Sequence, residues 1–124
     1  MPYQTDYVLR LVEQLSGLIR RAIEKLGVAG AKEPSEVGGR AIGLALGLDL
    51  SVASELSPQS IVALLELGNL DVRVIKLVAE AIEFESKVHW TRGEKTEIRR
   101  EQASAVRAFE RARKHEARSR GVDC

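Results

Sequence analysis

Apolar residues between positions 8 and 26 recur at steps of three and four, and this spacing constrains the fold more than any other feature of the chain. The set comprises Val8, Leu11, Val12, Leu15, Leu18, Ile19, Ala22, Ile23 and Leu26. Because an α-helix completes a turn in about 3.6 residues, these side chains form one apolar stripe along a helix. Thr5 or Asp6 is placed to cap the start of this helix, and Gly27 is placed to end it in a left-handed turn.

Four further segments carry the same periodicity behind residues that favour helix starts. A second helix is expected after Ser35, a third after Ser57-Pro58, a fourth after Asp71 and a fifth after Thr96. Aromatic residues make up 4% of the chain and no useful stretch alternates, so nothing indicates a β-strand. The sequence therefore predicts an all-α bundle of about five helices, packed as helical hairpins.

The 124-residue chain is long enough for one domain that closes a core without a metal or a disulfide. Apolar periodicity ends near Ala117, so residues 1–117 are expected to form a single helical domain and residues 118–124 a flexible tail. The single cysteine, Cys124, suits a reducing environment. No apolar run approaches the roughly 20 residues that a membrane span needs, so we expect a cytoplasmic protein.

Three glycines fall within the expected second helix. Gly39, Gly43 and Gly47 lie four residues apart and would share one face. Each glycine costs a helix interior about 0.5–1 kcal/mol relative to alanine, which requires a compensating contact. One interpretation is that a neighbouring helix backbone packs closely against this face, and the other is that residues 38–47 form a broken helix.

The last third of the chain is basic. Residues 1–91 contain nine Lys or Arg against twelve Asp or Glu, whereas residues 92–124 contain ten against six. Arg107, Arg111 and Arg118 are spaced to line one side of the fifth helix, where they could contact phosphates. Acidic residues interleave with them, and no aromatic platform for stacking bases accompanies them. Binding of nucleic acid through this helix is therefore the second hypothesis for the function.

A lone tryptophan, Trp90, lies near the end of the expected fourth helix, beside His89 and close to Arg92. Tryptophan and arginine are enriched at binding hot spots, so Trp90 is a candidate anchor for a partner. The alternative, which the sequence favours, is that Trp90 closes the hydrophobic core at the turn between the last two helices.

No group of residues has the spacing of a catalytic or metal site. The two histidines and Cys124 form no pair at metal-ligand spacing. Carboxylates gather at Glu80, Glu83 and Glu85, but a solvated helix face produces the same spacing. The glycine-rich run 38–43 lacks the Lys-Ser/Thr ending of a phosphate loop. We expect no metal, no cofactor and no enzymatic activity.

Two stretches resemble known families. The opening DYVLRLVEQL (6–15), the segment LSPQSIVALLELGNLD (56–71) and the helical pair that follows resemble an uncharacterised family of short bacterial all-helical proteins. That resemblance implies an all-α fold and a bacterial cytosolic setting, and no activity. The last two expected helices resemble a tetratricopeptide unit, with Gly93 in the turn and the spacing of Ala105, Phe109 and Ala112 in the second helix.

These observations favour protein–protein interaction or self-association as the function. Helical hairpins of tetratricopeptide character expose grooves and carry no chemistry of their own. In a domain of this size we expect part of the apolar stripe of the first helix to stay uncovered, which predicts a homodimer or a higher homo-oligomer. A nucleic-acid-associated accessory protein that acts through the basic C-terminal helix is the alternative.

Overall fold

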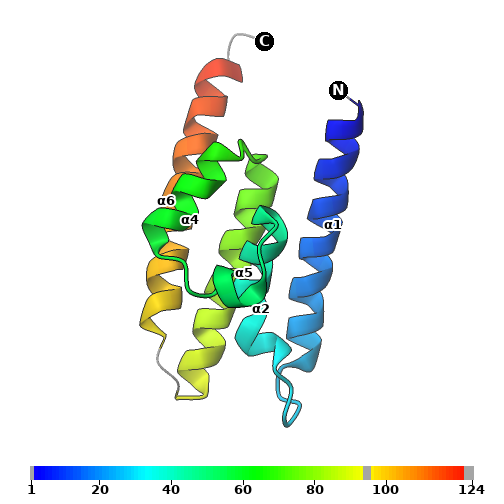
Figure 1. Cartoon of the computed structure of the whole chain (residues 1–124), viewed down its shortest axis with the longest axis vertical. Coiled ribbons are helices and arrows are strands. Elements are labelled where there is room, and N and C mark those ends of the chain that lie inside the picture. Colours follow the sequence, from blue (N-terminus) through cyan, green and yellow to red (C-terminus); the bar gives the residue numbers. More distant parts are fainter. Residues whose placement is uncertain (1, 94–95, 122–124) are drawn as a thin grey trace.

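A computed structural model describes residues 2–93 and 96–121. These residues form six helices and no strand, which confirms the predicted all-α bundle (Figure 1). The helices are α1 (Pro2–Lys25), α2 (Glu33–Leu46), α3 (Leu50–Ala53), α4 (Pro58–Leu67), α5 (Val72–Thr91) and α6 (Glu97–Gly121). The short helix α3 was not predicted, because four residues are too few for a periodic apolar pattern.

Helix α5 is the centre of the bundle. It packs against α1, α2 and α6, while α4 packs against α6 (Figure 1). Fully buried aliphatic side chains from all six described helices form a single core, including Leu15, Ile42, Ala53, Ile61, Ile82 and Val106. The long helices α1 and α6 lie on either side of α5, so the core consists of helix–helix contacts on both sides of one central helix.

The capping residues locate some helix starts and miss others. The Ser57 side chain accepts a hydrogen bond from the Ser60 amide at 3.1 Å, and that of Asp71 accepts one from the Arg73 amide at 2.8 Å. Both caps are confirmed. The predicted cap at Ser35 is wrong: α2 begins earlier, at Glu33, and takes Pro34 into its first turn. Proline is tolerated there because the first amides of a helix need no partner within the helix.

Both terminal helices are longer than their sequence patterns indicate. Helix α1 already begins at Pro2, so neither Thr5 nor Asp6 caps it. At the other end, the sequence predicts that the helical domain stops at residue 117, but α6 continues to Gly121. A long helix rich in Arg and Glu continues without an apolar stripe because these residues have high helix propensity. Cys124 lies outside the described residues.

The glycines of α2 occupy a regular helix, so the interpretation of a broken helix is wrong. A Cβ atom on Gly39 would lie 2.4 Å from Ser54 Oγ, and one on Gly43 would lie 2.6 Å from the Leu48 carbonyl oxygen. The close neighbours therefore belong to the chain that turns back after α2 and to α3. Gly47 has a different role, since it follows the helix with a φ of +71° and no atom near its missing side chain.

Candidate functional site

The structure describes the surroundings of the residues that the sequence singled out as candidates for interaction. Trp90 is 73% exposed, so the interpretation that it closes the core is wrong. Arg107 is half-buried and is held by two carboxylates, with Nε 2.8 Å from Glu83 Oε2 and Nη1 2.6 Å from Glu110 Oε1. Arg111 and Arg118 are exposed. The predicted row of three free arginines is therefore reduced to two.

Other basic side chains of α6 are also engaged within the fold. Lys114 Nζ lies 3.0 Å from Glu110 Oε2, and Arg113 donates a hydrogen bond to the Leu70 carbonyl oxygen at 3.2 Å. Burial raises the pKa of Glu110, but the hydrogen bonds from Arg107 and Lys114 outweigh this, and its pKa lies below the ordinary value. Much of the positive charge of α6 is thus balanced inside the molecule.

A buried polar cluster lies between α2, α5 and α6, and we call it the Glu85 cluster: Glu85, His89, Arg99 and Gln102 with the backbone amides of Gly38 and Gly39. Glu85 is fully buried, and its Oε1 accepts hydrogen bonds from the amides of Gly38 at 2.8 Å and Gly39 at 3.2 Å. Arg99 Nε donates to Oε2 of the same carboxylate. The carboxylate thereby ties the first half of α2 to the start of α6.

The remaining members of the Glu85 cluster bind backbone carbonyls. His89 Nε2 lies 3.0 Å from Glu85 Oε2 and 3.1 Å from the Ser35 carbonyl oxygen. Because both of these oxygens are acceptors, Nε2 carries the proton. Arg99 Nη1 donates to the Ser54 carbonyl oxygen at 2.9 Å, and Gln102 Nε2 donates to that of Leu56 at 2.8 Å. The cluster therefore supplies hydrogen-bond donors to backbone carbonyl groups in the irregular segment between α3 and α4, which is a structural role.

The sequence contained a signal for this cluster that was missed. Glu85 was interpreted as part of a solvated carboxylate face, but it follows Val78 and Ile82 at helical spacing and so belongs to the buried stripe of α5. Glu83 instead pairs with Arg107, and Glu80 lines a different hollow. The three carboxylates therefore point to separate places. In the described part of the chain, no three His, Cys, Asp or Glu side chains are grouped so that they could hold a metal ion.

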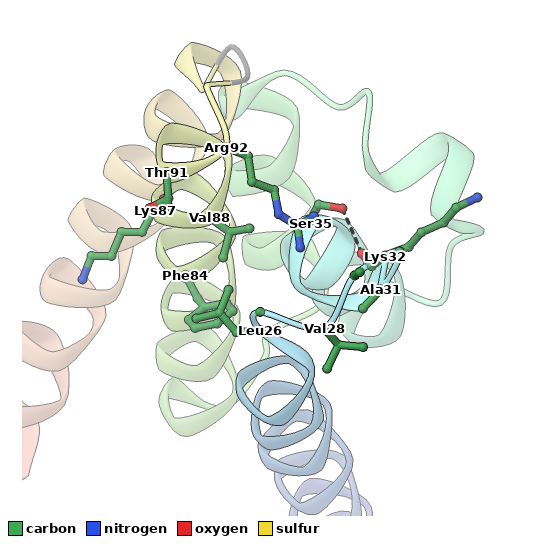
Figure 2. Close-up of a pocket in the computed structure, with 13 residues that line it drawn as sticks. Leu26, Val28, Ala31, Lys32, Ser35, Phe84, Lys87, Val88, Thr91 and Arg92 are labelled. Carbon is green, nitrogen blue, oxygen red and sulfur yellow. Dashed lines mark hydrogen bonds between the residues drawn. The ribbon is translucent and has the colours of Figure 1, made fainter.

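The candidate functional site is a hollow at the end of the bundle, which we call the connector groove. Its walls are the connector between α1 and α2 (residues 26–32), the start of α2 and the last two turns of α5 (Figure 2). Its volume is about 880 Å³, within the range of pockets that hold ligands or partner side chains. Within the connector, Gly27 and Gly30 take left-handed φ angles of +90° and +80°, which glycine adopts without a steric penalty.

The interior of the connector groove is apolar. Phe84 and Val88 come from α5, and Leu26 and Val28 come from the connector (Figure 2). Leu26 is 48% exposed and Val28 is 50% exposed, so these side chains are not used to close the core. Sequence reasoning missed the groove because it depends on how the connector lies against α5, and neither segment indicates this by itself.

Basic side chains surround this apolar interior. Lys32, Lys87 and Arg92 are all exposed, and every charged side chain among the described lining residues is basic. The two lining hydroxyls serve backbone carbonyls nearby, Ser35 that of Lys32 and Thr91 that of Lys87, each at 2.9 Å. The groove therefore offers an apolar floor and a positive rim.

Comparison of the chain with protein-family models, with curated proteins and with solved structures gave no match. The resemblances to a bacterial helical family and to the tetratricopeptide unit therefore stay predictions. Among the described helices, none combines the length and the apolar character needed to cross a membrane.

Proposed function

We propose that this protein is a protein–protein interaction module that receives a helix of a partner in the connector groove. The observation that carries the proposal is the pair Leu26 and Val28, which are half-exposed and which line, together with Phe84, a hollow of about 880 Å³. Apolar side chains around a groove are the usual receptor for the apolar face of an amphipathic helix. Covering such a surface removes it from water, which favours association.

The arrangement of the other exposed groups gives less support to the alternative, nucleic-acid binding. Phosphate binding relies on a set of cations that are free to replace counterions. In α6, Arg107 and Lys114 are paired with carboxylates, and Arg99 is engaged with Glu85. In the described part of α6, the exposed arginines that form no ion pair are Arg100, Arg111 and Arg118, a small set for tracking a phosphate backbone. In the connector groove, by contrast, the apolar side chains of Leu26 and Val28 are half-exposed, and the lining cations form no ion pair with a described residue.

The proposal is tested with a phage-displayed library of helical peptides selected against the purified protein. We expect enriched peptides with apolar residues at i, i+3 or i+4, and i+7, and we expect their binding to be lost in the double variant Leu26→Ser/Val28→Ser. The control is Leu67→Ser, because Leu67 is 81% exposed on α4 and does not line the groove. Binding that survives the double variant, or a selection that enriches no helix, would contradict the proposal.

A further inference from the structure

We infer that the connector groove selects a partner helix whose apolar face is flanked by acidic side chains. This inference rests on the proposed function and adds the chemistry of the partner to it. Three observations carry it: the sign of the charges on the rim, the absence of an ion pair between them and any described residue, and their placement on opposite sides of the apolar floor.

The first two observations concern the charge balance of the rim. Lys32, Lys87 and Arg92 line the groove, and no carboxylate is among the described lining residues. Elsewhere in the described structure, Arg40, Arg73, Arg99, Arg107 and Lys114 each form an ion pair, whereas other exposed cations such as Arg20, Arg111 and Arg118 form none. Among the described residues, the three rim cations form none. What distinguishes the groove is that three unpaired cations line one hollow without a carboxylate among its described lining residues, which favours an acidic partner over a neutral or basic one.

The third observation separates a helix from a small anionic molecule. Lys87 extends from α5 on one side of the hollow, and Lys32 extends on the other side, beyond the connector (Figure 2). Arg92 reaches from the end of α5 toward Ser35. A fatty acid carries one anionic head and would engage one side only. A helix that lays its apolar face on Phe84 and Val88 carries side chains along both flanks, and carboxylates there would approach cations on both sides.

The preference for acidic side chains in the partner is expected only over the connector groove, because the neighbouring hollow carries mixed charges. About one helical turn before the groove, α1 and α5 line a smaller hollow with Ile23 and Leu77 in its interior. Its charged lining residues are Arg20, Glu24 and Glu80, so acidic and basic groups are mixed there. A long partner helix could continue into this hollow. We therefore expect the acidic residues of the partner to matter over the connector groove and to lose their effect beyond it.

The test uses three synthetic helical peptides with one shared apolar face and with acidic, neutral or basic flanks, titrated against the full chain by fluorescence anisotropy. We expect the acidic peptide to bind at least about tenfold more tightly than the neutral one, as several partly exposed ion pairs would give. Raising the salt from about 50 mM to about 500 mM should remove most of this difference, because screening acts strongly on exposed charges. The basic peptide should bind weakest.

A charge-reversed variant provides the matched control. Lys32→Glu/Lys87→Glu should reverse the order and favour the basic peptide. Arg111→Glu/Arg118→Glu makes the same change in net charge on the exposed side of α6 and should leave the order unchanged. If reversal in α6 acts as strongly as reversal at the rim, the effect comes from net charge and the inference is wrong.

The outcomes distinguish this inference from the proposed function. Equal binding of the three peptides, lost in Leu26→Ser/Val28→Ser, would overturn the acidic preference and leave the interaction module standing. No binding of any peptide would overturn both. Dodecanoate is tested as a competitor of the labelled acidic peptide: if it displaces that peptide at a lower concentration than the unlabelled peptide does, the groove is assigned to an anionic amphiphile. A dimer mass in sedimentation, lost in Leu26→Ser/Val28→Ser, would assign it to a second copy. Each of these last two results would overturn the inference.

Discussion

Phe84 and Glu85 are neighbours in α5, yet they face two regions with opposite treatment of charge. Glu85 is fully buried, and its carboxylate is held by two backbone amides, Arg99 and His89. Phe84 faces the connector groove, where Lys32, Lys87 and Arg92 lack internal partners in the described structure. One region balances its charge within a few ångströms, and the other leaves its charge directed at solvent.

This difference separates what holds the fold from what is available to a partner. A buried charge without its partner is very costly, so the Glu85 cluster is complete in the isolated chain. An exposed cation costs almost nothing when unpaired, so the groove can keep its cations for a ligand. We therefore expect substitutions in the cluster to act on stability and substitutions in the groove to act on binding.

The largest effect is expected from Glu85→Gln. The amide oxygen can still accept from the Gly38 amide, but the Arg99 guanidinium, whose side chain is 12% exposed, loses its counter-charge. Breaking a buried pair in this way should lower the free energy of unfolding by about 3–5 kcal/mol. Urea unfolding followed by circular dichroism measures the loss. Glu83→Gln is the matched control, since the Glu83 side chain is 37% exposed and its loss should cost about 1 kcal/mol or less. Equal losses in the two variants would contradict the comparison.

The next effect is expected from Gly38→Ala. A Cβ atom there would lie 2.9 Å from Glu85 Oε1 and 3.0 Å from the Cα of Ile82, so the carboxylate or the α5 backbone must shift. We expect a net loss of about 1–3 kcal/mol despite the better helix propensity of alanine. Gly17→Ala in α1 is the control, because the nearest atom would be Arg20 Nη2 at 3.8 Å. That variant should gain up to about 1 kcal/mol. A gain in both would show that α2 has room to move.

A smaller, pH-dependent effect is expected at Glu110, whose burial opposes ionisation while Arg107 and Lys114 favour it. Its pKa is lowered in the folded protein, so the ionised form contributes stability above the unfolded pKa of about 4.5. That contribution is lost as the pH falls through the lower, folded pKa. Glu110→Gln should therefore cost about 1–2 kcal/mol at pH 7, as expected for hydrogen bonds to a charged group, and much less near pH 3. Urea midpoints of the two proteins across this pH range test it, and a gap that widened in acid would contradict it.

The smallest effect on stability is expected from the groove itself. Lys32→Glu/Lys87→Glu changes two exposed side chains that have no internal ion pair among the described residues. The free energy of unfolding should change by less than about 0.5 kcal/mol per site. The thermal midpoint should stay close to that of the wild type, although the order of peptide affinities reverses. A loss comparable to that of Glu85→Gln would mean that the rim also holds the fold.

The sequence predicted the all-α fold and two of the local caps, although the caps expected at Thr5 or Asp6 and at Ser35 were wrong. Ser57 and Asp71 cap helices because a hydroxyl or a carboxylate reaches an amide two or three residues away. The spacing of Gly39, Gly43 and Gly47 predicts close packing; Gly39 and Gly43 lie close to the chain around α3, whereas nothing lies near the missing side chain of Gly47. By contrast, Glu85 accepts hydrogen bonds from the amides of Gly38 and Gly39, which lie 47 and 46 residues earlier in the chain. The periodicity of α5 cannot predict such distant partners.

The connector groove could not be predicted for a related reason. Its floor belongs to α5 and its outer wall to residues 26–32, and their distance is set by the packing of α1 and α2 against α5. The same packing decided which arginines of α6 became engaged. A helical pattern places Arg107, Arg111 and Arg118 on one side, but only the fold brings Glu83 within reach of the first of them.

The connector between α1 and α2 has a consequence for how the specificity of such a chain can evolve. It supplies one wall of the groove from seven consecutive residues, and none of them belongs to the buried core. Gly27 and Gly30 have nothing within 4 Å of a missing side chain, so backbone conformation alone fixes them. Val28, Ala29 and Ala31 can then vary while the two glycines stay. Under the proposed function, changing these few consecutive residues would redirect the groove to a different partner helix while the bundle stays unchanged.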